Sequence, residues 1–244
     1  MTLSCCDICN DTGYIFYTDN RGYEYVKPCN CRILAESEAR FKKSGLADGF
    51  RTKSFENFAT ADNPKLVDAK TTAENFTSGV IEAKNQIAEE GKISYGSLLL
   101  CGQPGAGKTH LGTASSMKII DAGIPVIYMS YREEIIKLKQ SVTDDSYDAK
   151  IGVFKSCDVL FIDDFLKGRI TESDVNIMYE IINFRYNKKL PTIVSTEKDL
   201  KGILDFDEAI GSRLIEMSRG HIISFDDKEL NFRIFGGGKR HGSI

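Results

Sequence analysis

Residues 98–109 read Leu98-Leu99-Leu100-Cys101-Gly102-Gln103-Pro104-Gly105-Ala106-Gly107-Lys108-Thr109. An apolar run ends in a glycine-rich turn, and apolar residues at helical spacing follow from Leu111 to Ile120. The stretch fits the pattern G-x-x-x-x-G-K-[ST] between a strand and a helix. Its glycines let backbone N–H groups point inward, where they and the helix dipole can hold a chain of phosphates. We therefore expect a nucleoside triphosphate site, the alternative being a glycine-rich turn that happens to contain lysine.

The loop and the first residues of its helix are the expected nucleotide ligands: Gly102, Gln103, Pro104, Gly105, Ala106, Gly107, Lys108, Thr109 and His110. Two of them have chemical roles beyond backbone contact. Lys108 can reach the β- and γ-phosphates of ATP, and the Thr109 hydroxyl can ligate Mg²⁺.

A second apolar run, the four residues 159–162, ends in Asp163 and Asp164. A buried parallel strand is continuously apolar, and ligands lie at the carboxyl ends of such strands. Asp163 is expected to hold Mg²⁺, directly or through water, and Asp164 to orient and deprotonate the attacking water. The alternative is a strand that is followed by an acidic turn.

Composition limits the classes of protein to consider. The chain has 244 residues, 41% of them hydrophobic and 27% charged, with a formal net charge of −3. This is typical of a globular protein with a real core, and no overall positive field attracts it to nucleic acid. No apolar run approaches the roughly 18 residues that span a membrane, and the first residues do not form a signal peptide. We expect a cytoplasmic protein without a membrane partner, whose cysteines are metal ligands or core residues.

Five of the seven cysteines lie in the first 31 residues. Cys6 and Cys9 form a C-x-x-C pair, and Cys29 and Cys31 form a C-x-C pair. Two pairs brought together by a hairpin form a zinc ribbon, and four thiolates suit tetrahedral Zn²⁺. Cys5 could replace Cys6 as a ligand, and free cysteines on a loop are the alternative. About thirty residues cannot build a core of their own, so the metal would supply the folding free energy.

Hydrophobic periodicity predicts the other elements. Strands are expected at residues 12–17, 23–26, 98–101, 125–130, 158–162, 190–197 and 221–225, and helices at 32–45, 64–90, 111–120, 132–140 and 171–187. Residues 141–146 are polar and predict a surface loop, and residues 211–212 predict a glycine-serine turn ahead of Arg213. Three regions follow: a zinc-binding head with a linker helix (1–50), a nucleotide-binding domain (51–235) and a flexible basic tail (236–244).

Together these features resemble the AAA+ helicase loaders of the DnaC/DnaI type, especially phage-encoded versions. The resemblance covers nearly the whole chain. It rests on the cysteine-rich head, Phe55-Glu56-Asn57-Phe58, residues 102–109, Ile162-Asp163-Asp164, Ser195-Thr196-Glu197, Gly211-Ser212-Arg213 and Arg233. It implies an α/β fold in which helices flank a five-stranded parallel sheet, without a C-terminal helical lid, and a small zinc-ribbon-like head.

The resemblance also implies roles for single residues. Arg213 would reach a neighbouring subunit's nucleotide as an arginine finger, and Arg233 would sense nucleotide in its own subunit; the alternative for each is a surface salt bridge. Thr196 is the expected first sensor, because Glu197 stands where Asn is common. Asp164 replaces the more usual Glu, so hydrolysis is expected to be slow.

The implied function is an ATP-dependent loader of the hexameric replicative helicase. Its head would bind the helicase, and its ATPase domain would self-associate and contact single-stranded DNA near Lys137 and Lys139. The expected cofactors are ATP, Mg²⁺ and Zn²⁺. Two alternatives remain: a transposition-helper ATPase of the IstB-like kind, and a nucleotide-gated adaptor with little turnover.

Overall fold

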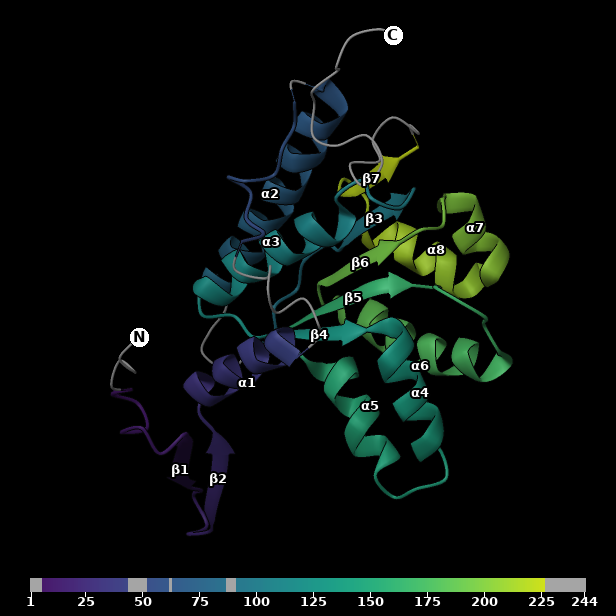
Figure 1. Ribbon diagram of the computed structural model, residues 1–244. Helices are drawn as coiled ribbons and strands as arrows, with labels where there is room; N and C mark the ends of the chain where they lie inside the picture. The colour runs from purple at the N-terminus through teal and green to yellow at the C-terminus, as the bar shows by residue number, and fades with distance from the viewer. Residues whose placement is uncertain (1–5, 44–51, 62, 87–90, 227–244) are drawn as a thin grey trace, which may run out of the picture.

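The computed structural model describes residues 6–43, 52–61, 63–86 and 91–226 (Figure 1). Cys5, the expected domain boundary near residue 50, Arg233 and the tail at 236–244 lie outside the described residues. Within them, no helix combines the length and the apolar character that crossing a bilayer requires.

A five-stranded parallel sheet forms the centre of the molecule, which confirms the predicted α/β fold class. Its strands lie in the order β4-β5-β6-β3-β7. They span Leu98–Gly102 (β3), Val126–Ser130 (β4), Val159–Phe165 (β5), Thr192–Thr196 (β6) and Ile222–Phe225 (β7). The strand that precedes the glycine-rich loop, β3, therefore pairs with β6 and β7, and β5 lies one strand further along.

Helices cover both faces of this sheet. They span Pro64–Asn85 (α2), Lys108–Asp121 (α3), Tyr131–Ser141 (α4), Tyr147–Ser156 (α5), Glu172–Lys188 (α6), Leu200–Phe206 (α7) and Glu208–Met217 (α8). The helices α2 and α3 pack on one face, and α4 to α8 pack on the other (Figure 1). Leu98 and Leu100 of β3 point into the first layer, whereas Leu99 and Cys101 point into the second. Both faces of the strand are buried, which is why its sequence is continuously apolar.

Three local features differ from the sequence predictions. The short helices α5 and α7 were not predicted, because α5 buries only Ile151 and Phe154 and α7 buries only Ile203. The expected glycine-serine turn at 211–212 is wrong, since both residues lie inside α8. A Cβ on Gly211 would lie 3.0 Å from the carbonyl oxygen of Ile203. This glycine serves the close packing of α7 against α8.

The head consists of the antiparallel hairpin of β1 (Tyr14–Thr18) and β2 (Glu24–Pro28), followed by the helix α1 (Asn30–Lys43). The hairpin confirms the prediction for this stretch. The helix α1 contacts the larger domain: Asn30 Nδ2 donates to the carbonyl of Gly123 at 2.9 Å, and Leu34 packs against the first hydrophobic layer. The head is thus attached to the larger domain near the start of β4.

Candidate functional site

The glycine-rich loop is shaped by three glycines. Gly102, Gly105 and Gly107 have φ angles of 109°, 74° and 94°, a region that side chains disfavour. A Cβ on Gly102 would lie 2.4 Å from the carbonyl oxygen of Phe225, so glycine is also required for space. The helix α3 begins at Lys108 directly after Gly107, which has no side chain to cap it. The first N–H groups of α3 are therefore available to an anion.

The side chain of Lys108 folds back over the loop and binds loop carbonyls. Its side chain is 6% exposed, and Nζ donates to the carbonyls of Gly102 at 2.8 Å and Gln103 at 2.6 Å. Burial lowers the pKa of Lys108, while Glu197 and Asp164 act in the opposite direction. The ammonium group is thereby fixed at the place where the loop encloses its ligand.

Asp163 lies beside the loop and accepts hydrogen bonds from three hydroxyl groups. Thr109 donates to Oδ1 at 3.0 Å, Tyr128 donates to Oδ2 at 3.0 Å, and Ser195 also donates to Oδ1. Burial is the main reason why the pKa of Asp163 is raised, and Asp164 adds to it, whereas the hydroxyls oppose the rise. The Thr109 hydroxyl and the Asp163 carboxylate are adjacent oxygen donors, a set that fits Mg²⁺.

The sheet is irregular at the two acids. Ile162 pairs with Val194 and Phe165 pairs with Thr196, so β5 has one residue more than β6 between these pairs. Asp164 sits in this bulge with a φ of 56°. Its N–H donates to Ser195 Oγ at 3.0 Å, in place of a regular ladder bond. The Ser195 hydroxyl therefore contacts both acids: it donates to the side chain of Asp163 and accepts from the backbone N–H of Asp164.

A cleft of about 300 Å³ connects these groups. It is lined by Lys53, Pro104, Gly105, Gly107, Lys108, Thr109, His110, Asp163, Asp164, Lys167 and Glu197. Of the expected site residues, the loop, Lys108, Thr109, His110 and both acids are brought together. The cleft also contains Lys167 and Glu197, which the sequence reasoning did not assign to the site.

The tip of β6 is arranged differently from the expectation. The Thr196 hydroxyl is buried and donates to the carbonyl of Phe165 at 2.7 Å, and Thr196 does not line the cleft. Glu197, the next residue, does line it. The geometry favours Glu197 over Thr196 as the group at this strand tip that faces a nucleotide.

Arg213 lies away from the cleft on α8. Its guanidinium group stacks near the rings of Tyr179 and Tyr186, at 5.4 and 5.5 Å from their centres. It also donates to Asn183 Oδ1 at 3.1 Å and to the carbonyl of Ala209 at 2.8 Å. Arg213 does not line this chain's own cleft.

The residues before α2 form one wall of the site. His110 Nε2 lies 2.8 Å from the carbonyl oxygen of Ser54, and because a carbonyl only accepts, Nε2 is the protonated nitrogen. Burial lowers the pKa of His110, which keeps the ring neutral. Phe58 meets His110 edge-on and occupies the space that a Cβ on Gly107 would need. The segment at 54–58 therefore packs directly on the phosphate-binding loop.

The two expected DNA-contacting lysines are paired within the chain. Lys137 forms an ion pair with Glu134 at 2.6 Å, and Lys139 forms one with Asp174 at 2.8 Å. Asp174 also completes the capping box of α6 with Thr171. This geometry does not favour either lysine as a DNA ligand.

In the head, the four cysteines Cys6, Cys9, Cys29 and Cys31 have sulfur atoms within 4.8 Å of one another. The Cys6–Cys29 and Cys9–Cys31 sulfur pairs are 3.8 and 3.5 Å apart. Tetrahedral Zn²⁺ at a Zn–S distance of about 2.3 Å needs sulfurs about 3.8 Å apart, so the four residues fit this ion.

The thiols of this cluster also affect one another's ionisation. Burial opposes ionisation of Cys9, but a hydrogen bond with the Gly13 backbone and the neighbouring thiols bring its pKa to about 7. The hydrogen bond with Cys9 and burial raise the pKa of Cys31 to about 12. A cation is needed before all four sulfurs can be thiolates together.

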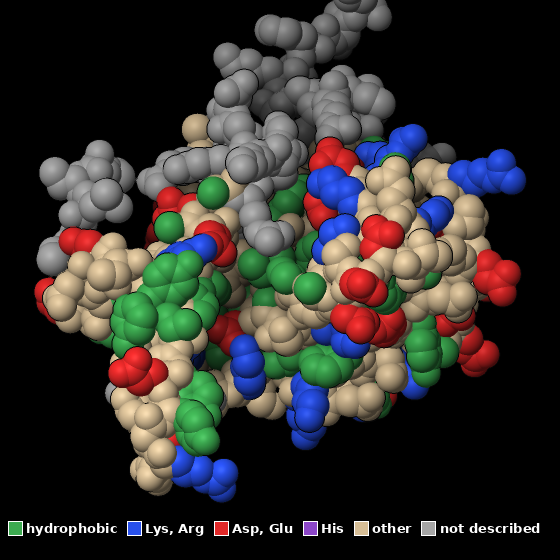
Figure 2. Space-filling model, turned by 90° about the horizontal axis from the view of Figure 1, so that it is seen from below, with side chains coloured by type: hydrophobic (Ala, Val, Ile, Leu, Met, Phe, Trp, Pro, Cys, Tyr) green, Lys and Arg blue, Asp and Glu red, His purple; other side chains and the backbone are tan. Residues whose placement is uncertain are grey.

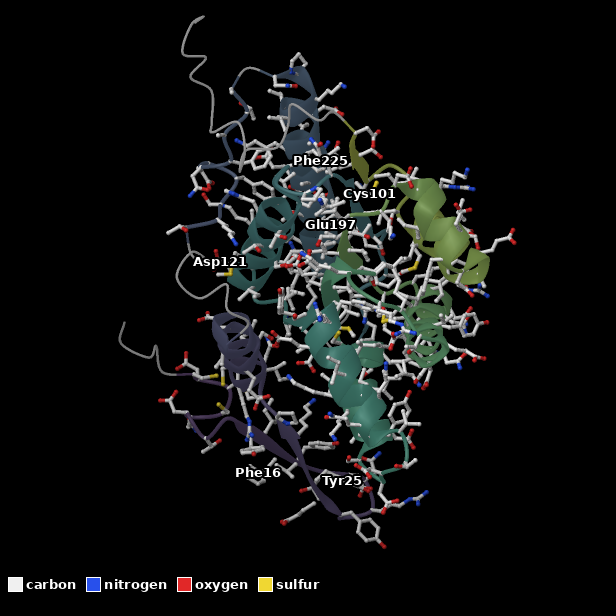
Figure 3. All side chains as sticks on the ribbon, turned by 45° about the vertical axis from the view of Figure 1, so that its right-hand side comes forward. Phe16, Tyr25, Cys101, Asp121, Glu197 and Phe225 are labelled. Carbon is white, nitrogen blue, oxygen red and sulfur yellow. The ribbon has the colours of Figure 1, made fainter. Side chains whose placement is uncertain are left out.

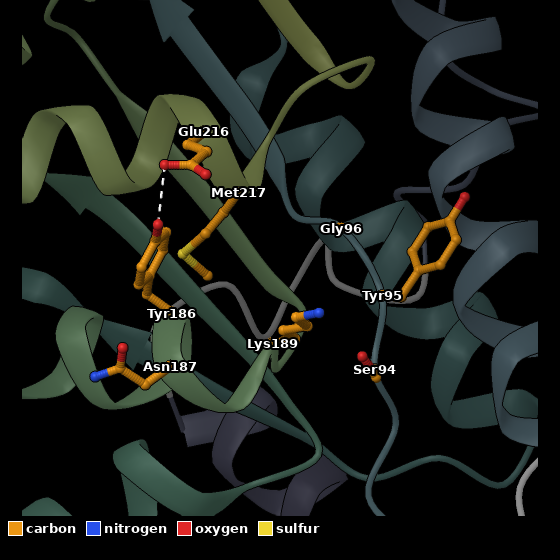
Figure 4. Close-up of a pocket in the computed structure, with 8 residues that line it drawn as sticks. All are labelled: Ser94, Tyr95, Gly96, Tyr186, Asn187, Lys189, Glu216 and Met217. Carbon is orange, nitrogen blue, oxygen red and sulfur yellow. Dashed lines mark hydrogen bonds between the residues drawn. The ribbon is translucent and has the colours of Figure 1, made fainter.

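A second hollow, of about 500 Å³, lies at the opposite end of the sheet (Figure 4). It is lined by residues that come shortly before β3, β6 and β7 in the chain: Ser94, Tyr95, Gly96, Tyr186, Asn187, Lys189, Glu216 and Met217. The Tyr186 hydroxyl donates to Glu216 Oε2 at 3.0 Å across one wall. None of its lining residues belongs to the glycine-rich loop or the acid pair, so the nucleotide chemistry belongs to the smaller cleft.

The sequence contained weak signals for the residues that were missed. Tyr128 and Ser195 are buried side chains with hydroxyl groups, in the two strands that flank β5, and a buried hydroxyl needs a partner. Lys167 follows the acid pair by three residues. Nothing in its spacing indicates that the chain turns back toward the cleft.

The family described as "IstB-like ATP binding protein" matches residues 89–214. The chain is 31% identical over 240 residues to the phage-like element PBSX protein XkdC of Bacillus subtilis (strain 168), which covers 95% of this chain and 86% of that protein. Its fold is similar to the crystal structure of the DnaC helicase loader (TM-score 0.54, 21% identity, 72% of this chain and 98% of that one). It is also similar to the crystal structure of DnaI (TM-score 0.52, 20% identity, 71% and 86%).

Proposed function

Because the chain belongs to the family of IstB-like ATP-binding proteins, we propose that it is an ATP-dependent loader that places a replicative helicase on single-stranded DNA. The observation that carries this proposal is the combination of two sites in one chain. A cysteine head that fits zinc is attached to a fold in which a phosphate loop, Thr109 and Asp163 converge. The fold likeness to the helicase-loader structures adds support.

In this proposal the cleft binds ATP and hydrolyses it slowly. The loop N–H groups and Lys108 hold the phosphates, while Thr109 and Asp163 hold Mg²⁺. When bound, Mg²⁺ neutralises phosphate charge. Asp164 accepts the proton of the attacking water, and the hydrogen bond from its N–H to Ser195 Oγ fixes its backbone in the β5 bulge. Arg213 stays outside its own cleft and acts on the γ-phosphate of a neighbouring copy.

The head supplies the surface for the helicase. Large apolar side chains are exposed on it: Ile8, Tyr14, Phe16, Tyr17, Tyr23, Tyr25 and Val26. Figure 2 shows groups of hydrophobic side chains at its left, and Phe16 and Tyr25 lie far from the sheet in Figure 3. Phe16 is 75% exposed. Exposed apolar patches of this kind mark interaction sites.

Charge does not mark the head as a nucleic-acid surface. Its described residues, 6–43, include six acidic and six basic residues, so there is no excess of positive charge. Nucleic-acid surfaces carry such an excess. In this proposal single-stranded DNA contacts the ATP-binding domain instead.

A pull-down with a purified hexameric replicative helicase, with and without ATP, tests the proposal. The unaltered protein should capture the helicase, and the Cys6→Ser/Cys9→Ser double variant should not. Cys157→Ser is the matched control, because Cys157 is a cysteine outside the head. Equal capture by both variants would contradict the proposal.

A transposition-helper ATPase is the second candidate, because the matching family is named for IstB-like proteins. Such a protein would bind double-stranded DNA and a transposase through its ATP-binding domain. In the same pull-down the unaltered protein would then capture a transposase instead of the helicase, and the Cys6→Ser/Cys9→Ser variant would keep that capture.

A further inference from the structure

Three charged side chains meet at the rim of the nucleotide cleft. Lys167 Nζ lies 2.9 Å from Asp164 Oδ2 and 3.3 Å from Glu197 Oε1. All three residues line the cleft. Glu197, labelled in Figure 3, lies near the carboxyl ends of the parallel strands, as do Cys101 and Phe225. The ammonium group of Lys167 thus bridges the expected catalytic base and the acid at the tip of β6.

The turn that presents Lys167 is strained. Asp164, Leu166 and Gly168 have φ angles of 56°, 63° and 96°, and two of these residues are not glycine. The side chain of Leu166 is 3% exposed and packs in the second hydrophobic layer, and Lys167 N–H donates to the Asp164 carbonyl at 3.1 Å. Burial of Leu166 holds the turn, so that Asp164 and Lys167 both face the cleft. Strain of this kind gathers at functional sites.

Structural stabilisation is a poor explanation for this arrangement. The side chains of Asp164, Lys167 and Glu197 are each between 37% and 43% exposed. Ion pairs with this exposure contribute little to stability. A strained turn that delivers a cation to the rim of a phosphate site indicates a ligand instead.

The ligand that fits is a terminal phosphate. Lys108 is already fixed over the loop by the carbonyls of Gly102 and Gln103. Lys167 lines the same cleft beside Asp164, on a flexible four-carbon stem. A γ-phosphate would bring an anion of higher charge than either carboxylate within reach of its ammonium group.

We propose that Lys167 binds the γ-phosphate and distinguishes ATP from ADP; this inference rests on the ATP binding proposed above. Without nucleotide, Lys167 neutralises Asp164 and Glu197. With ATP, its ammonium group turns to the γ-phosphate and releases the Asp164 carboxylate, which can then accept a hydrogen bond from water. With ADP, Lys167 returns to the two carboxylates.

Calorimetric titration with a non-hydrolysable ATP analogue and with ADP, each with Mg²⁺, tests the proposal. Lys167→Ala should weaken binding of the ATP analogue about tenfold, the loss of one charge-assisted hydrogen bond, and change ADP binding less than about twofold. Lys167→Arg should retain part of the preference for the analogue. Glu197→Gln should strengthen binding of the analogue relative to ADP, because it removes a competitor for the ammonium group.

The control is Arg169→Ala, which removes the same charge from the same loop at an exposed residue outside the cleft. It should leave the preference for the ATP analogue intact. Suppose that the unaltered protein binds both nucleotides. If Lys167→Ala then weakened the binding of both equally, or of neither, Lys167 would only form a structural ion pair and the inference would be wrong. If the unaltered protein bound neither nucleotide, the proposed ATP binding would itself be refuted. A thermal melt of each variant checks that it is folded.

Discussion

At Asp163, three hydroxyl groups stabilise a carboxylate that burial disfavours. Thr109, Tyr128 and Ser195 come from α3, β4 and β6, so the carboxylate is positioned by three separate elements. The net effect is a raised pKa, which means that the nucleotide-free fold would be more stable with a neutral group at this position.

Asp163→Asn should therefore raise the stability of the nucleotide-free protein at neutral pH, by about 1 kcal/mol for each unit by which the native pKa is raised. It should also remove the thermal stabilisation that Mg²⁺-ATP gives the unaltered protein. Melting curves with and without Mg²⁺-ATP measure both effects. A variant that is less stable than the unaltered protein, or one that Mg²⁺-ATP still stabilises, would contradict this assignment.

The same carboxylate predicts how ATP binding depends on pH. Protons and Mg²⁺ compete for Asp163, and the raised pKa makes protonation begin at a higher pH than for an ordinary aspartate. The Mg²⁺-dependent part of the ATP affinity should fall as the pH is lowered through that raised pKa. Titrations from about pH 8 to about pH 5, compared with the same series without Mg²⁺, measure it. An affinity that is flat over this range would mean that the pKa of Asp163 is not raised.

At the scale of elements, the second layer depends on one buried arginine. Arg185 of α6 is fully buried, and burial lowers its pKa. Its guanidinium group donates to Thr192 Oγ1 at 2.8 Å and to backbone carbonyls that include Pro191 at 2.6 Å and Cys157 at 2.9 Å. It thereby joins the end of α5 to α6 and to the start of β6.

Arg185→Met should lower the free energy of unfolding by about 2–3 kcal/mol, because several buried carbonyls lose their donor at once. Arg185→Lys should restore only a part, since an ammonium group cannot reproduce the planar fork. Urea denaturation measures both. Arg169→Met, at an exposed site, is the control and should change stability by less than about 0.5 kcal/mol.

At the scale of the whole molecule, the head and the ATP-binding domain are stabilised in different ways. The larger domain has two hydrophobic layers, whereas the hairpin exposes most of its apolar side chains. The cysteine cluster is the feature that can hold the hairpin in place.

Treatment with a metal chelator should therefore abolish amide-exchange protection in β1 and β2 while the protection of β3 to β7 persists. Metal affinity should fall as the pH is lowered, because protons compete for the thiolates. Hydrogen exchange followed by mass spectrometry measures the protection, with the protein before chelation as the control. Full protection of the hairpin after chelation would exclude a structural metal.

Subunit exchange tests the assigned role of Arg213. Lys108→Ala removes the lysine of the phosphate loop and keeps the arginine, and Arg213→Ala does the reverse. If Arg213 acts on a neighbour, a mixture of the two inactive variants should recover a fraction of the phosphate release of the unaltered protein. No recovery, with both variants able to form oligomers, would assign Arg213 to its own subunit or to structure.

The sequence allowed the sheet, the phosphate loop and the acid pair to be predicted, because each has a local pattern of apolar runs and glycines. It did not predict α5 or α7, since helices that bury only one or two residues have hardly any periodicity. It also assigned Thr196 where Glu197 faces the cleft, because side-chain direction there depends on the bulge in β5. Lys167 was missed because its direction depends on the backbone conformation of the turn around it. That conformation depends in turn on the packing of Leu166 in the second hydrophobic layer, which the local sequence does not reveal.

The bond between Asn30 and Gly123 has a mechanical consequence. The helix α3 starts at the phosphate loop with Lys108 and ends at Asp121, two residues before the carbonyl that Asn30 binds. Its fourteen residues form a rod about 21 Å long. A tilt of this rod at the phosphate loop would displace its far end, and with it the contact that holds the cysteine-bearing head.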